Sequence, residues 1–285
     1  MIIVPGSNFV HAGNIPARYD TFDPRADEFA ETEVVVDLRG CEIVHPPAIL
    51  WCVVYLLLAS QRGASCTLWV PINTGVASYL RDVGLFELLK SKQIDVDDRG
   101  LPAVSSSQTI LSLTQFNTET EAEQLTNDTS EHLVDSGIGS ANLYPIMTEN
   151  FAELAMNAAQ HSKSSIGSFG LVQFFGSEGK RKFICAVADG GVGIRESLMG
   201  NSAYREKIPY DWTAIELASR ERISGTGNPN RGIGLYGVSE DMHKPGRQLI
   251  IHSGIGSLRI NENLEFRAAR TRLFPGTLAS VWIPA

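Results

Sequence analysis

Cysteine is scarce in this sequence and is not arranged for metal binding. The chain of 285 residues contains four cysteines, Cys41, Cys52, Cys66 and Cys185, and no two of them form a CxxC pair. Three of the four lie in strongly apolar stretches, where a thiol acts as a small hydrophobic side chain. We therefore expect buried thiols in a reducing compartment and no metal site built from cysteine.

Basic residues are in deficit as well. The chain has 24 Lys and Arg residues against 32 Asp and Glu residues, which gives a net charge of −8. A general nucleic-acid binder normally carries a basic surplus or a basic stripe, so no nucleic-acid partner is expected. The acidic balance still permits a small local anion site.

Long hydrophobic runs are missing too. The most apolar stretch, AILWCVVYLLLAS at residues 48–60, has thirteen residues, whereas a helix needs roughly 20 to cross a bilayer. The N-terminal MIIVPGSNFVHAG also lacks the basic region and long apolar run of a signal peptide. We expect no membrane partner, a fully buried helix over residues 48–60 and a cytoplasmic location.

The first hundred residues alternate between strand and helix patterns. EVVVDLRG (33–40) and CTLWV (66–70) are predicted strands. PPAILWCVVYLLLASQRG (46–63) is a predicted helix that begins with prolines and closes on a glycine, and NTGVASYLRDVGLFELL (73–89) has helical spacing. This order predicts an α/β domain in residues 1–100, with a sheet covered by helices.

This segment resembles STAS domains, the fold of anti-sigma-factor antagonists. The resemblance rests on a strand ending in DLRG, then a helix, a strand, and a helix ending in DVGLFELL. Phosphorylatable antagonists carry a serine just before the first long helix, but EIVHPPAIL (42–50) contains neither Ser nor Thr. The resemblance therefore implies a scaffold or interaction surface without a phosphorylation switch.

Residues 101–140 are polar and are expected to connect the first domain to a second one. TILSLTQF (109–116) is predicted to be an edge strand that opens the second domain. TETEAEQLTNDTSEHLVD (118–135) suits a solvated helix.

The helix predicted over ENFAELAMNAAQHS (149–162) carries a polar line on an otherwise apolar rod. Glu149, Glu153, Asn157 and His161 follow one another at four-residue steps. Residues four apart lie on the same side of a helix, so an acid, an amide and an imidazole share one face. That face is a candidate binding site.

Glycine motifs follow this helix. FGLVQFFG (169–176) and KFICAVAD (182–189) are predicted to form a hairpin, and the second strand runs into Asp189 and a glycine cluster. NRGIGLYGVSEDMH (230–243) places a second glycine pair before a helix, whose N-terminus is a natural phosphate site. Finally, FPGTLASVWIPA (274–285) places a Gly-Thr pair at the opening of a terminal strand.

The order of these motifs resembles the GHKL (Bergerat-fold) ATPase superfamily, over about residues 140–285. The motifs are Glu-x-x-x-Asn on a helix, Asp-x-Gly-x-Gly after a strand, Gly-x-Gly before a helix, and Gly-Thr near the end. The resemblance implies a Bergerat-fold α/β sandwich in residues 141–285 that binds ATP and Mg²⁺. The fold class expected for the whole chain is therefore α/β (α+β).

The resemblance also implies roles for the polar line. Asn157 matches the residue that binds Mg²⁺, and Glu153 matches the catalytic acid that orients or deprotonates the attacking group. Glu149 is expected to be a solvated or supporting residue. His161 either contacts phosphate or stabilises the helix C-terminus, and the second role is favoured.

The glycine motifs would complete the nucleotide site. Asp189 would accept a hydrogen bond from the exocyclic amine of adenine, with help from Thr277, and Gly191 and Gly193 would shape the pocket. Residues 195–231 would form a lid over ATP. The residues expected to contact phosphate or to line the site beside it are Arg231, then Arg222, with Gly232, Gly234 and Leu235.

The expected function is that of an ATP-binding regulatory protein, a Mg-dependent ATPase or a nucleotide-driven switch. It would act through a protein partner or through self-association. The alternatives are a Ser/Thr protein kinase of the anti-sigma-factor type and a nucleotide-sensing module without turnover. A histidine autokinase is disfavoured, because none of the six histidines lies in a two-helix dimerisation hairpin.

Overall fold

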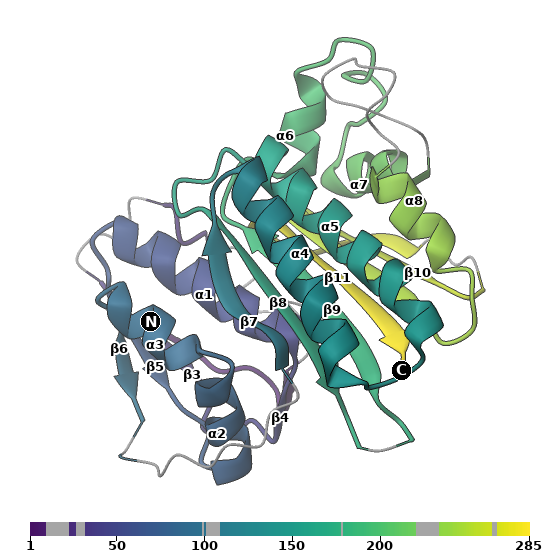
Figure 1. Cartoon of the computed structure of the whole chain (residues 1–285). Coiled ribbons are helices and arrows are strands. Elements are labelled where there is room, and N and C mark those ends of the chain that lie inside the picture. Colours follow the sequence, from purple (N-terminus) through teal and green to yellow (C-terminus); the bar gives the residue numbers. More distant parts are fainter. Residues whose placement is uncertain are drawn as a thin grey trace.

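Two sheets of different kinds organise the chain. The computed structural model describes residues 1–9, 23–26, 32–98, 100, 109–177, 179–220, 234–263 and 267–285. The N-terminal part forms a four-stranded parallel sheet, and the C-terminal part forms a five-stranded antiparallel sheet (Figure 1). The expected mixed α/β class is confirmed.

The parallel sheet has the strand order β1-β3-β5-β6. Its strands are β1 (Ile2–Ile3), β3 (Glu33–Asp37), β5 (Ser65–Trp69) and β6 (Asp95–Asp97). A separate two-stranded pair joins β2 (Asn8–Phe9) to β4 (Ile43–Val44). Helix α1 (Pro46–Gln61) follows β4, so the predicted strand–helix–strand order is confirmed.

The helix predicted over residues 73–89 is two helices, which corrects the sequence prediction. The first is α2 (Thr74–Asp82), capped by the Asn73 side chain, and the second is α3 (Leu85–Ser91). Gly84 separates them with a φ of 88°, a left-handed conformation that favours glycine. Helical spacing continues across this break, so periodicity alone does not reveal it.

The antiparallel sheet has the order β10-β11-β9-β8-β7. Its strands are β7 (Thr109–Phe116), β8 (Ser168–Phe175), β9 (Lys182–Asp189), β10 (Gln248–Asn261) and β11 (Arg267–Pro284). The predicted edge strand and the predicted hairpin are both confirmed, with Phe175 opposite Lys182. The terminal strand begins at Arg267 and not at the Gly-Thr pair, which lies at an irregularity inside β11.

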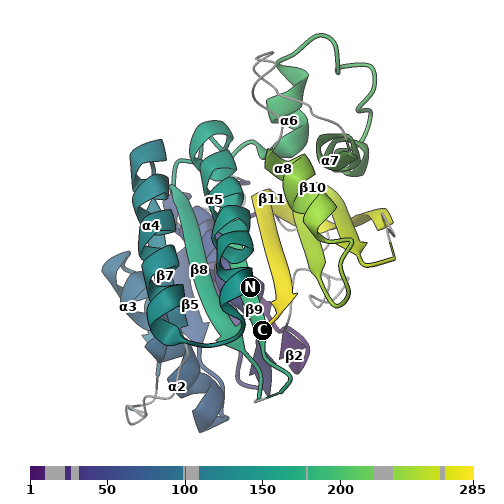
Figure 2. The same cartoon turned by 45° about the vertical axis from the view of Figure 1, so that its right-hand side comes forward.

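Helices cover one face of this sheet and extend beyond its end. Helices α4 (Glu119–Ser136) and α5 (Tyr144–His161) lie side by side over the sheet, after a short 3₁₀ turn at Ala141–Leu143 (Figure 2). The helices α6 (Gly193–Met199), α7 (Asp211–Arg220) and α8 (Gly234–Asp241) gather near the end of the sheet where β9 stops. The helices predicted after residue 118 and after Gly232 are thus present.

Helix α1 covers the opposite face of the antiparallel sheet. The helix is apolar on all sides and is buried from Pro46 to Ala59, as expected for a helix enclosed by other layers. Side chains of β8 and β9 alternate between the two faces, as strand geometry requires. Phe169, Leu171, Ala186 and Ala188 join the core with α1, whereas Val172, Phe174, Cys185 and Val187 join the core with α5.

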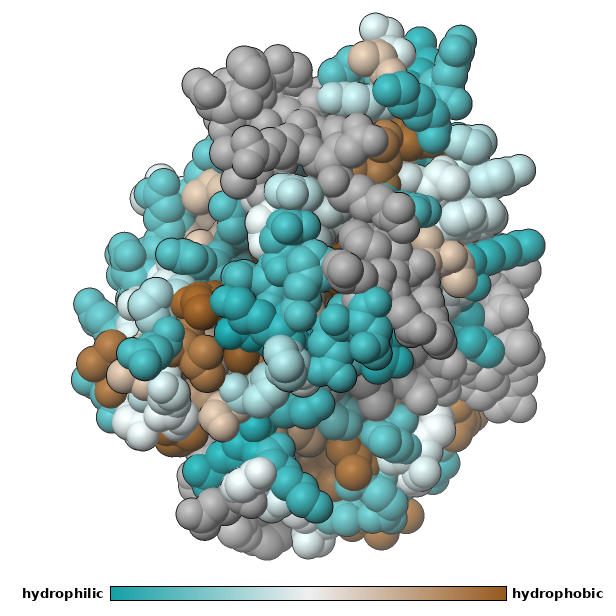
Figure 3. Space-filling view, turned by 90° about the vertical axis from the view of Figure 1, so that its right-hand side faces the viewer, coloured by the Kyte–Doolittle hydropathy of each residue, from teal (hydrophilic) through white to brown (hydrophobic). Residues whose placement is uncertain are grey.

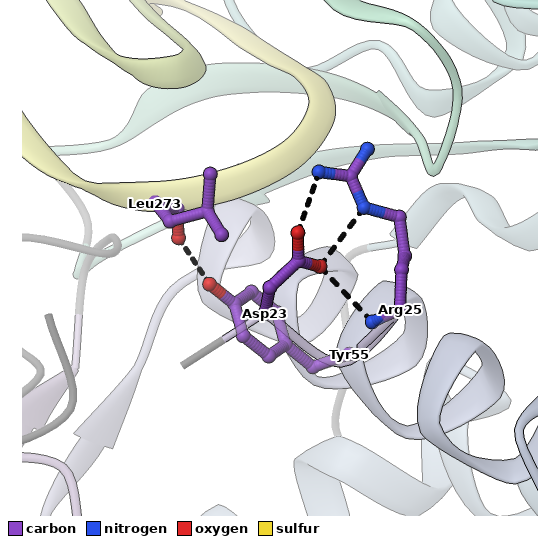
Figure 4. A network of polar contacts seen from close by, with 4 residues as sticks. All are labelled: Asp23, Arg25, Tyr55 and Leu273. Carbon is purple, nitrogen blue, oxygen red and sulfur yellow. Dashed lines mark hydrogen bonds and ion pairs between the residues drawn. The ribbon is translucent and has the colours of Figure 1, made fainter. Parts of the chain in front are cut away.

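One hydrogen bond crosses this junction, and a local ion pair lies beside it. The Tyr55 hydroxyl on α1 donates a hydrogen bond to the carbonyl oxygen of Leu273 on β11 (Figure 4). Close to it, Arg25 forms a two-pronged ion pair with Asp23, with nitrogen–oxygen distances of 2.9 Å. The core cluster around α1 contains side chains of both sheets, so the parallel-sheet segment and the antiparallel sheet share one hydrophobic core.

Because of this shared core, a small change in α1 is expected to destabilise both parts together. Ile49 is 0% exposed, and Ile49→Val should lower the free energy of unfolding by about 0.5–1.5 kcal/mol. Urea unfolding should remain a single transition when followed by circular dichroism and by tryptophan fluorescence. The control is Ile72→Val, because Ile72 is 68% exposed. Two separate transitions, with only one of them shifted, would contradict the shared core.

The apolar helix α1 packs against both sheets, which enclose it. Among the residues that the structure describes, no helix is both long enough and apolar enough to cross a bilayer. His45, directly before α1, packs its ring 4.5 Å from the ring of Phe175 and 5.3 Å from that of Trp282, measured between centroids.

Candidate functional site

A row of polar side chains crosses four neighbouring strands at one end of the antiparallel sheet. Ser168 on β8 lies opposite Asp189 on β9, Asp189 lies opposite Thr277 on β11, and Thr277 lies opposite Ser253 on β10. Directly opposed residues share a face of the sheet. On β9, the side chain of Ala188 points towards α1 and that of Val187 points towards α5. Asp189 is two residues after Val187, so its side chain also points towards α5. The row therefore lies on the α5 side of a sheet that is otherwise apolar there.

Asp189 is the charged member of this row, and it is 3% exposed. Its Oδ1 accepts a hydrogen bond from the Gly191 N–H at 2.8 Å, and the carboxyl group also accepts one from the backbone N–H of Thr277. Burial raises the pKa of Asp189 to about 7, and the two backbone donors only partly oppose this rise. A carboxylate has about four acceptor positions, so two donors leave capacity for a ligand.

Glycines let the backbone approach this carboxyl group closely. A Cβ at Gly191 would overlap the carbonyl oxygen of Ser162, and a Cβ at Gly276 would overlap the backbone of Asp189. Gly193 has a φ of 78°, and a Cβ there would lie 2.8 Å from Ser253 Oγ. The sequence motifs around residues 190 and 276 thus meet at one place, and each needs glycine for steric reasons.

The residues of the polar line on α5 differ in how far they are buried. Glu149 is exposed, whereas Glu153 and Asn157 are half-buried. Burial raises the pKa of Glu153, and the negative charge of Glu149 raises it further. The side-chain amide nitrogen of Asn157 is buried and has no hydrogen-bond partner among the described residues. His161 lies in the last turn of α5 and is half-buried.

Helix α8 begins directly against this line. A Cβ at Gly234 would overlap the Glu153 carboxylate and would lie 3.4 Å from Asn157 Nδ2. Only a glycine lets the start of α8 come so close to both side chains. The structure thus brings together Glu153, Asn157 and Gly234, and it packs Leu235 against the core beneath α5. The other predicted residues of this segment, Arg222, Arg231 and Gly232, lie outside the described residues.

The far end of α8 is held by residues that the sequence analysis missed. Asn150 Nδ2 donates to Asp241 Oδ2 at 3.1 Å, and Arg247 Nη1 donates to the Asp241 carbonyl oxygen at 3.3 Å. Asn150 and Arg247 are 1% and 6% exposed. These contacts fix α8 to α5 and to the start of β10. No sequence motif marked Asn150, because its partner is 91 residues away.

The described part of the expected lid and the residue before it, Ile194, pack on β10. The N–H of Ile194 in α6 donates to Ser253 Oγ at 2.8 Å, and Asp211 Oδ2 at the start of α7 accepts from the Ile255 N–H at 2.8 Å. Gly254 and Gly256 make room for α7, since a Cβ at either would overlap Asp211 or the Trp212 backbone nitrogen. Residues 221–231 of the expected lid are not among the described residues.

The surface on the side of α8 and β10 is mainly hydrophilic. In Figure 3, the coloured hydrophobic residues of this face occur in small separate groups. The coloured residues there form no broad apolar patch of the kind that marks a large protein interface. Within the described ranges, no group of three or more His, Cys, Asp or Glu side chains is arranged to hold a metal ion.

Comparison with known proteins adds no assignment for this arrangement. Neither a protein-family model nor a curated protein matches the chain.

Proposed function

We propose that the antiparallel-sheet part of the chain binds ATP with Mg²⁺ and acts as a slow ATPase or a nucleotide-driven switch. The observation that carries the proposal is the polar row of Ser168, Asp189, Thr277 and Ser253, which lies on the α5 side of the sheet. The resemblance to the GHKL superfamily points to two of these residues, Asp189 and Thr277. A sheet end with one buried carboxyl group and close-packed glycines suits a flat heterocycle with an exocyclic donor.

Asp189 supplies the selectivity in this proposal. Its ionised carboxylate accepts a hydrogen bond from the exocyclic amine of adenine. Guanine carries an acceptor oxygen at the same ring position, so the carboxylate repels it. Adenine binding therefore favours the ionised form of a group whose pKa of about 7 in the free protein reflects burial.

Asn157 and Glu153 divide the work at the phosphates. Asn157 would hold Mg²⁺ through its side-chain oxygen, a ligand that this ion accepts. Its side-chain nitrogen is buried without a partner among the described residues, so a bound phosphate would supply the acceptor that this nitrogen lacks. When bound, Mg²⁺ neutralises negative charge on the phosphates. Glu153 would orient or deprotonate the attacking group, and burial already raises its pKa in the direction of a general base.

The proposal also covers what happens to bound ATP and how the protein acts on a partner. Hydrolysis, transfer to a Ser or Thr of a protein, and sensing without turnover all start from this same site. A shift of α8 on ATP binding would change how the protein meets a partner or a second copy of itself. The cytoplasm, where Mg·ATP is abundant, is the proposed location.

Calorimetry with Mg·ATP and Mg·GTP tests the proposal, with Asn157→Ala as the variant. The wild type should bind ATP more tightly than GTP, and Asn157→Ala should reduce ATP affinity in Mg²⁺ by about tenfold or more, to the level found with a chelator. Its thermal stability without nucleotide should not fall, because the Asn157 amide nitrogen has no partner to lose among the described residues.

The matched control is Gln160→Ala, an amide on the same helix that bonds Glu119 at the surface. This variant should bind Mg·ATP like the wild type. Equal affinity for ATP and GTP would contradict an adenine-selective pocket. If Asn157→Ala strongly lowered the melting temperature without nucleotide, the polar line would have a structural role and not a binding role.

A further inference from the structure

Ser253 has a defined set of hydrogen bonds at the end of the polar row. It is 2% exposed, and it lies directly opposite Thr277. Its Oγ accepts the N–H of Ile194 at 2.8 Å and donates to the carbonyl oxygen of Gly276 at 3.0 Å. A third contact joins Ser253 Oγ to Thr277 Oγ1 at 3.3 Å.

Counting protons decides the direction of this third contact. A serine hydroxyl has one proton and two acceptor positions. The carbonyl oxygen of Gly276 cannot donate, so the Ser253 proton must be given to it, and the Ile194 N–H occupies one acceptor position. The remaining capacity of Ser253 is that of an acceptor. In the contact between the two hydroxyls, Thr277 is therefore the donor.

The direction of this hydrogen bond determines what the Thr277 hydroxyl can offer to a bound base. A threonine hydroxyl whose only proton is given to Ser253 presents lone pairs in its other directions. The backbone N–H of Thr277 already serves the Asp189 carboxyl group. The row therefore places two acceptors next to each other, the Asp189 carboxylate and Thr277 Oγ1.

We propose that Ser253 is a positioning residue for base selectivity, because it fixes the Thr277 hydroxyl as an acceptor. This inference rests on the proposed function. An exocyclic amine has two protons and can satisfy both acceptors, whereas a purine with a carbonyl oxygen at that position meets two acceptors and no donor. Without Ser253, the Thr277 hydroxyl is free to turn its proton towards such an oxygen, and the discrimination weakens.

A double-mutant cycle on Ser253 and Thr277 tests this inference. The measured quantity is the ratio of the dissociation constants for Mg·GTP and Mg·ATP, obtained by calorimetry. Ser253→Ala should lower this ratio by about tenfold, the effect of one hydrogen bond of ordinary net strength. In the Thr277→Val background, Ser253→Ala should leave the ratio unchanged, because no hydroxyl is left to turn.

A second pair of variants keeps the test decisive if Ser253→Ala does not fold. Thr277→Ser keeps the hydroxyl and should keep the ratio, whereas the nearly isosteric Thr277→Val should lower it. An unchanged ratio in Thr277→Val would overturn the inference.

Each further outcome of the cycle also has a meaning. A ratio that falls equally in both backgrounds would make Ser253 a structural support of α6 and would overturn the inference, as would a ratio that Ser253→Ala leaves unchanged. In both cases the ATP site itself would stand. A wild type that binds no ATP would overturn the site and this inference together.

Discussion

Asp189→Asn is expected to weaken ATP binding strongly and, at the same time, to stabilise the protein without nucleotide. The loss of affinity should be about 1–3 kcal/mol, or roughly 5- to 150-fold, because the amide puts a donor where the adenine amine needs an acceptor. Calorimetry with Mg·ATP measures this loss. The control is Asp95→Asn, an exposed residue of β6.

The gain in stability follows from the pKa of Asp189. Burial raises this pKa from 3.8 to about 7, and a tenfold change in an acid dissociation constant corresponds to about 1.4 kcal/mol between the two protonation states. The buried charge therefore costs free energy at pH 8, and asparagine removes it while still accepting the Gly191 N–H. A simple turn former would behave in the opposite way, and its replacement would lower the melting temperature.

The raised pKa of Asp189 also predicts the pH dependence of both properties. A group with a raised pKa in the folded state stabilises the fold fully below its unfolded pKa, and this contribution is lost as the pH rises through about 7. ATP affinity should change in the opposite direction and fall below pH 7, because adenine needs the ionised form. Both trends should be absent from Asp189→Asn. Parallel profiles for the wild type and the variant would show that another group titrates.

The sequence predicted most elements, because apolar periodicity reports directly on burial. The β8–β9 hairpin, the edge strand β7 and helix α5 all show their period without knowledge of the fold. The break at Gly84 escaped, since a single left-handed residue leaves the helical spacing on both sides intact. The early start of β11 also escaped, because residues 267–273 carry three arginines and little apolar alternation.

The site was predictable only where its residues form local motifs. Asp189 and Thr277 stand beside glycines that mark them, and the register places them opposite each other. Ser253 and Ser168 have no such neighbours in a recognisable pattern, and only strand pairing brings them into the row. The burial of α1 was predicted from its composition, but the sequence does not say which two sheets enclose it.

Glu153→Gln should abolish most turnover of ATP while leaving its binding intact. The amide keeps the shape of the side chain and its place against Gly234, but it cannot take a proton. Loss of a general base lowers the rate by about 10²- to 10⁴-fold. The dissociation constant for Mg·ATP should stay the same or decrease, since a negative charge next to the triphosphate is removed.

Glu149→Gln is the matched control for this measurement. Glu149 is one helical turn earlier on the same line, it is exposed, and its charge contributes to the raised pKa of Glu153. Its replacement should change the rate little and should shift the pH profile of turnover slightly towards lower pH, because the pKa of Glu153 falls. If Glu153→Gln turned over ATP at the wild-type rate, Glu153 would not be the base and Glu149 would become the next candidate. A wild type without turnover in the presence of any partner would leave ATP sensing as the function of the site.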